Sequence, residues 1–165
     1  MRLRAHVVLV VIVGLSLGAC RQADGPMPTP SEDVQEELKD VARDLQNVAS
    51  ARDPQARRDL ADDLRKYTST PGAAEAVDEL SQSAATVLAG VDLGEPAAEQ
   101  LAHSLWLSVA ASELSDRQTE TLQGDVQSLL MVEGIAEERA QQIAAQIGEV
   151  QGAVGARTRR WYELF

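Results

Sequence analysis

The chain has few of the residues from which metal and nucleophilic sites are built. Its 165 residues include one cysteine, Cys20, and two histidines, His6 and His103. A single cysteine excludes an intramolecular disulfide. His103 has no second histidine or further thiol after Cys20 to complete a metal or nucleophilic site. No HExxH, EF-hand or phosphate-binding glycine motif is present. These absences predict a protein that is not an enzyme and carries no metal or cofactor.

Aromatic residues and net positive charge are also lacking. Two tryptophans, two tyrosines and one phenylalanine make up the aromatic set, so alanine, leucine and valine must fill the core. Such small side chains suit closely packed helices. Arg2 and Arg4 are the only charged residues before Cys20, and the remainder has 13 basic and 26 acidic residues, a net charge of −13. That charge disfavours a nucleic-acid partner, whose binders need a basic surface.

The N-terminus has the organisation of a secretory signal. A short basic segment precedes the apolar run VVLVVIVGLSL at residues 7–17. Eleven residues are too few for a membrane span, which needs about 20, but they match the apolar region of a signal peptide.

The residues that follow this run, Leu17-Gly18-Ala19-Cys20, resemble the lipobox of bacterial lipoproteins. The resemblance covers residues 1–20. It implies a diacylglycerol on the thiol of Cys20, cleavage before that cysteine and acylation of the new amino group, which together give stable anchoring. In that family, a residue other than aspartate after the cysteine favours the outer membrane of two-membrane cells, facing the periplasm. Arg21 stands there.

We therefore predict three parts: a lipoprotein signal peptide (1–19), the lipidated cysteine with a flexible tether (20–30) and a helical domain (31–165). The tether reads RQADGPMPTP and has no apolar periodicity.

The domain has helical periodicity throughout, and no segment alternates as a strand would. We predict an all-α, up-and-down bundle of about five to six helices. Helix starts are indicated by Ser31, Asp53-Pro54, Thr70-Pro71 and the capping box Ser115-x-x-Gln118. A fourth helix, expected from about Pro96 to Leu114, is apolar on most faces and is placed centrally. On this helix His103 faces away from the apolar side and is interpreted as a partly exposed polar residue.

The turn before the last helix imitates a nucleic-acid motif. VEGIAEERAQQI resembles the helix-hairpin-helix pattern over a dozen residues, but Glu137 and Glu138 stand where phosphate would bind. We interpret it as a compact turn in which Gly134 frees the backbone and Ile135 plugs the gap between two helices.

The last helix, expected from about Ala136, carries small residues at every fourth position. This helix-packing ridge consists of Ala140, Ala144, Gly148, Gly152 and Ala156. Glycine within a helix costs about 1 kcal/mol relative to alanine, so a closely approaching helix is expected. The serine row Ser104, Ser108 and Ser112 is one candidate partner. Homodimerisation through the last helix and a frayed tail stay open as alternatives.

The C-terminal residues RTRRWYELF differ in composition from the acidic domain. They form a candidate contact surface for lipid headgroups or protein, with Trp161 and Phe165 as a lid over the bundle as the structural alternative. Its residues are Arg157, Arg159, Arg160, Trp161, Tyr162 and Phe165.

Together these features predict a lipid-anchored extracytoplasmic protein that acts by protein contact, as a scaffold, adaptor or inhibitor in the cell envelope. The membrane, through the lipid on Cys20, and an envelope protein are the expected partners. A binder of a small ligand or lipid in a cavity between helices is the alternative. A carboxylate-dependent cell-wall hydrolase is less favoured.

Overall fold

The computed structural model describes residues 25–50, 55–68, 70, 72–111 and 114–162, and the surroundings of side chains as far as residue 155. Within these ranges the protein is an all-α bundle of six helices without strands. The helices are α1 (Glu32–Ser50), α2 (Ala56–Arg65), α3 (Ala74–Leu88), α4 (Glu95–Ala110), α5 (Asp116–Val132) and α6 (Glu137–Tyr162). The predicted fold class is confirmed.

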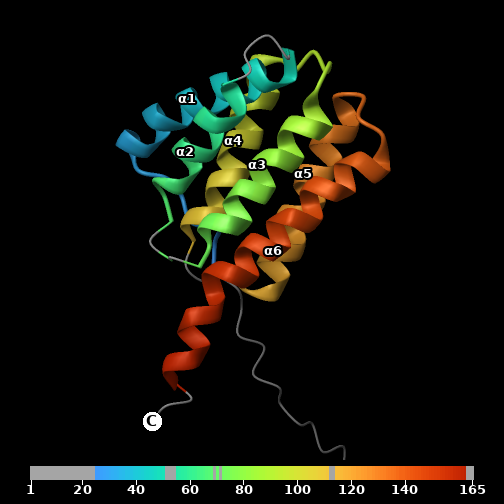
Figure 1. The fold of residues 1–165 in the computed structure, drawn as a ribbon. Coiled ribbons are helices and arrows are strands. Elements are labelled where there is room, and N and C mark those ends of the chain that lie inside the picture. Colours follow the sequence, from blue (N-terminus) through green and yellow to red (C-terminus); the bar gives the residue numbers. More distant parts are fainter. Residues whose placement is uncertain (1–24, 51–54, 69, 71, 112–113, 163–165) are drawn as a thin grey trace, which may run out of the picture.

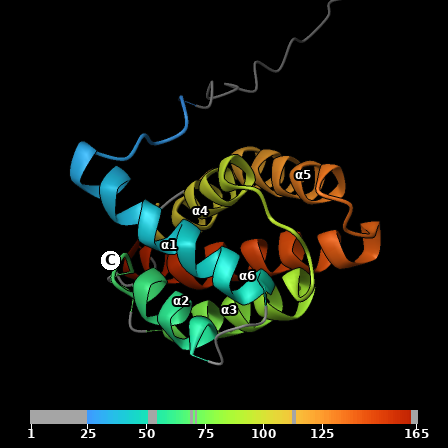
Figure 2. The ribbon, with the colours of Figure 1, turned by 90° about the horizontal axis from the view of Figure 1, so that it is seen from above.

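The six helices enclose one core (Figure 1). Contacts run from α1 to α2, from α2 to α3, from α3 to α6, from α6 to α5, and back through α4 to α1. Figure 2 shows α6 running between the α2–α3 pair and the α4–α5 pair. The apolar stripes of all six helices point inward, and the largest fully buried side chains are Leu45, Leu60, Leu64, Leu80, Leu88, Leu101, Leu105, Leu130, Ile143 and Ile147.

Helix α4 is central, as its composition predicts. It contacts α1, α2, α5 and α6. Residues on opposite sides of this helix are buried, among them Leu101, Leu105 and Trp106, which is 8% exposed. The stacked ring of His103 lies 5.7 Å from that of Trp106.

The helix ends follow most of the sequence signals. The Ser31 hydroxyl accepts from the amide of Val34, and the Ser115–Gln118 capping box forms in both directions. Thr70-Pro71 is a less accurate signal, since α3 begins at Ala74. Asp53-Pro54 lies outside the described residues.

Helix α4 ends at Ala110, short of the expected Leu114, and a side chain of another helix bonds its terminal carbonyls. The Gln151 amide nitrogen (Nε2) on α6 lies 2.5 Å from the carbonyl oxygen of Ser108, 3.4 Å from that of Leu107 and 3.3 Å from that of Ala111. Ala111 has an extended backbone (ψ 109°) and leaves the helix. Gln151 is 9% exposed. A buried amide thus supplies a donor at a helix end, where donors from the helix itself run out.

The α5–α6 connection is the compact turn expected from the sequence. Gly134 has a φ of +81°, a conformation that glycine adopts without steric cost. The amide of Gly134 bonds the carbonyl of Met131, and the amide of Ile135 bonds that of Leu130, which together form a Schellman motif. Ile135 is 5% exposed and fills the gap between the two helices.

The packing ridge on α6 is packed in its first half and open in its second. Ala140 and Ala144 are buried. Beside Gly148 lies the Gln123 side chain of α5, which donates to the carbonyl of Ala144 at 2.8 Å. Nothing lies within 4 Å of the position that a Cβ on Gly152 would take. Side chains from Ala156 onward lie outside the described surroundings.

The serine row does not fill the space beside Gly148, which α5 occupies. Ser104 and Ser108 donate to carbonyls of their own helix, those of Gln100 and Leu105. Ser112 lies outside the described residues. The chain itself thus covers this part of the ridge.

Removing the Gln151 amide should destabilise the domain. Gln151→Leu removes the buried donor that carbonyls at the end of α4 share, which costs about 1–3 kcal/mol. Thermal unfolding followed by circular dichroism measures this. Gln141→Leu makes the same change at an exposed position of the same helix and should stay within about 0.5 kcal/mol of wild type. Equal stability of the two variants would contradict the capping role.

The two ridge glycines should respond differently to alanine. Gly152→Ala should raise the free energy of unfolding by about 0.5–1 kcal/mol, because its Cβ enters open space and alanine favours the helix. Gly148→Ala should raise the free energy of unfolding by less, or lower it. Its Cβ would lie 2.6 Å from the Gln123 amide nitrogen and displace that side chain. Urea unfolding of both variants tests the difference, and an equal gain would show that the Gln123 contact contributes nothing.

Candidate functional site

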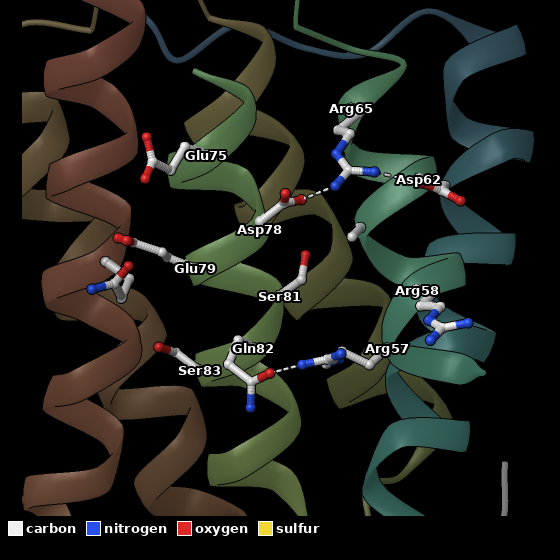
Figure 3. Close-up of a pocket in the computed structure, with 12 residues that line it drawn as sticks. Arg57, Arg58, Asp62, Arg65, Glu75, Asp78, Glu79, Ser81, Gln82 and Ser83 are labelled. Carbon is white, nitrogen blue, oxygen red and sulfur yellow. Dashed lines mark hydrogen bonds and ion pairs between the residues drawn. The ribbon is translucent and has the colours of Figure 1, made fainter. Parts of the chain in front are cut away.

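An open groove of about 760 Å³ runs along α3 (Figure 3). Residues of α2 form one wall, α3 forms the floor and Gln146 of α6 contributes on the other side. The lining side chains are mostly charged or polar: Arg57, Arg58, Ala61, Asp62, Arg65, Glu75, Asp78, Glu79, Ser81, Gln82, Ser83 and Gln146. Together they carry four acids and three arginines.

The groove exists because α2 and α3 meet through small or short side chains at the core and long charged ones above it. Ala61 and Ser81 are buried at its base, and the Ser81 hydroxyl donates to the carbonyl of Val77. The long arginines and carboxylates of both helices rise from this base. We thus expect the rim to be adaptable and the floor to be fixed.

The arginines of the groove are already engaged within the chain. Figure 3 shows Arg65 of α2 reaching Asp78 of α3, and it also bonds Asp62 at 2.6 Å. Arg57 bonds the amide of Gln82 on α3. Exposed pairs of this kind contribute about 1 kcal/mol or less each, so a polar partner can exchange them at little cost.

Gln146 supplies an acceptor that is not used within the described part of the chain. Its Oε1 is shielded from solvent and has no hydrogen-bond partner there, while its Nε2 donates to Glu149 at 2.9 Å. A buried acceptor without a donor costs free energy. A donor from a bound segment would therefore gain most at this side of the groove.

A second polar feature, the acidic cluster, lies around Asp44 on α1 and outside the groove lining. Burial is the main cause that raises the pKa of the Asp44 carboxyl to about 6, and the nearby carboxylates of Asp63, Asp59 and Asp40 raise it further. The cluster resembles no metal site: among the described residues no group of three or more histidine, cysteine, aspartate or glutamate side chains is arranged to hold an ion.

His103, the histidine singled out in the sequence, is half-buried on α4 beside Trp106. Burial lowers the pKa of its imidazole. It lies on a different helix from the groove lining and from Asp44, so the structure does not assemble these groups into one site.

The sequence-predicted site residues lie mostly at the two chain ends. Cys20 and Phe165 lie outside the described residues. Arg157, Arg159, Arg160, Trp161 and Tyr162 continue α6, and Figure 1 shows the last turns of this helix extending beyond the rest of the bundle. The contact surface and the alternative of a lid formed by Trp161 and Phe165 both stay predictions.

The segment before α1 is held against the bundle. The Gly25 carbonyl accepts from the amide of Gln118 on α5 at 3.0 Å, Met27 packs on the core, and Pro30 is buried. The part of the predicted tether that the structure describes, residues 25–30, therefore contacts the domain. No helix in the described ranges combines the length and apolar character that crossing a membrane requires.

Reasoning from sequence missed the groove and the buried glutamine. Arginine-rich α2 and acidic α3 do carry complementary charges, as in RRDLADDLR and AEAVDEL, which could have indicated their pairing. Gln151 is a polar residue among the apolar positions Ile147, Val150 and Val154, and that interruption was a usable signal.

Replacing Asp44 should stabilise the domain in a pH-dependent way. Because the folded pKa of this carboxyl is about 6 and its ordinary value is 3.8, ionisation above pH 6 opposes folding, and this cost is absent below pH 3.8. Asp44→Asn mimics the protonated form. We expect a gain on the order of 1 kcal/mol at pH 7.5, reduced by partial exposure, that shrinks toward zero at pH 4. Melting temperatures at both pH values measure it, with the exposed Asp92→Asn as control. A gain that is the same at both pH values would contradict this origin.

The chain matches no family model, no curated protein and no solved structure.

Proposed function

We propose that this chain is a lipid-anchored extracytoplasmic protein that acts by contact with another protein of the cell envelope. The anchor is the diacylglycerol that the resemblance of Leu17-Gly18-Ala19-Cys20 to a lipobox implies. The observation that supports protein contact is the groove along α3, which is open and lined by charged side chains. A polar segment of a partner suits such a lining better than a lipid or apolar ligand, whose sites are mostly enclosed and apolar.

The position of residues 25–30 supports a function close to the membrane. Gly25 is fixed on α5 through Gln118. Five residue steps separate it from Cys20, which span at most about 18 Å. A partner of this domain would therefore itself lie at the membrane surface.

The small-ligand alternative lacks support from the groove, because charged side chains line it. The hydrolase alternative needs two carboxyls facing each other across a deep groove, at least one with a raised pKa. Asp44 has the raised pKa but lies on α1, outside the groove lining.

The anchor is tested by Cys20→Ser in cells that process lipoproteins. We expect loss of acyl labelling and accumulation of the longer precursor, because the thiol is the only point of attachment. Acyl labelling equal to wild type would contradict the lipoprotein assignment.

The contact surface is tested by placing a photoreactive amino acid at Glu79 in the groove and, as a matched control, at Asp125 on α5, both exposed. We expect a discrete crosslinked envelope protein from position 79 and a weaker one or none from position 125. Equal crosslinking from both positions would show that the groove has no special role.

A further inference from the structure

Two segments of the chain, the residues before α1 and the last turns of α6, lie at the same end of the bundle. Gly25 is held there by Gln118, in the first turn of α5. The end of α4 lies there too, because Gln151 bonds the carbonyl of Ala111. Figure 1 shows the described N-terminal residues and the last turns of α6 directed toward this same end.

Helix α6 continues beyond Val154, which is buried in the core. It has eight more residues to Tyr162, a length of about 12 Å. These last turns carry Arg157, Arg159 and Arg160, followed by Trp161 and Tyr162. They form the basic tail.

The charge of the basic tail is opposite to that of the rest of the domain, which is strongly acidic. An anionic lipid surface repels the acidic body and attracts the arginines. Because electrostatic interactions fall off over about 8–10 Å in physiological salt, a helix that projects by more than this distance separates the two effects. Tryptophan and tyrosine next to arginine are also the residues that settle at the headgroup level of a bilayer.

We infer that the basic tail, residues 157–162, binds the anionic phospholipid surface in which the acyl chains on Cys20 are inserted. This rests on the proposed lipid anchor. The two attachments together hold the domain in a single orientation. In this orientation the α5–α6 turn at Gly134 faces away from the membrane. The groove along α3 then lies on the side of the bundle, between the membrane and this turn.

The chain contains its own reporter for this contact. Trp161 lies in the tail, and the only other tryptophan, Trp106, is 8% exposed in the core. The full-length lipidated protein carrying Trp106→Phe is reconstituted into phosphatidylcholine vesicles with or without phosphatidylglycerol. Brominated lipids then measure by fluorescence quenching whether Trp161 reaches the bilayer.

We expect quenching in anionic vesicles and little in neutral ones, with the docked state favoured on the order of 100-fold at low salt by three arginines. High salt should reverse it. Replacing Arg157, Arg159 and Arg160 together by glutamine should abolish the difference between the lipids. The same change at the exposed Arg43, Arg58 and Arg117 should preserve it. If Trp106→Phe does not fold, the quenching of Trp161 is obtained as the difference in fluorescence quenching between wild type and Trp161→Phe.

Quenching that is equal in the two lipid mixtures, or unchanged in the tail variant, would overturn the inference. Trp161 that stays unquenched on anionic vesicles while position 161 crosslinks to an envelope protein would assign the tail to a protein partner instead. Flotation with neutral vesicles measures membrane attachment through the acyl anchor, separately from the tail. A protein that does not float there disproves the anchor, whereas one that floats without quenching on anionic vesicles disproves only the role of the tail.

Discussion

The position of α6 depends on hydrogen bonds that its side chains make to the ends of two other helices. Gln151 closes the C-terminal end of α4 with its buried amide. Near the other end of α6, the guanidinium of Arg139 bonds the carbonyls of Thr86, at 2.9 Å, and Val87 at the end of α3. A cation at this point also suits the negative end of a helix dipole. One helix thus bonds carbonyls at the ends of two others, α3 and α4.

This arrangement explains how a core with few aromatic side chains stays specific. Leucine, valine and alanine supply apolar burial, which is non-directional and tolerates several packings of similar volume. Buried polar groups are less tolerant, because an unpaired carbonyl costs free energy in any alternative register. The buried Gln151 therefore helps to define the register of α6 against α4, which apolar contacts alone define only weakly.

The helices and their inward faces could be predicted from the sequence because each depends on residues close together in the chain. Ser115 and Gln118 cap α5 through a local pattern, and Gly134 with Ile135 forms a local turn. The contact at the end of α4 could not be predicted in this way, since it involves Gln151, which lies 40 residues further along the chain than Ala111. The partner of Gly148 depends likewise on the register of α5, and the groove depends on which faces of α2 and α3 meet.

The rigid placement of α6 also connects fold and proposed function. A helix that leaves a bundle from a fixed point directs its end, whereas an unattached segment would sample many directions. Gln151 and the buried Val154 hold the helix in the bundle, and the residues after them carry the arginines and Trp161. The segment at residues 25–30 is held on the same end through Gln118. Loss of the Gln151 contact would therefore affect more than stability, because it would loosen the helix whose last turns carry the proposed membrane contact. In the proposed arrangement, a buried amide inside the core thus helps to set the direction of a surface feature.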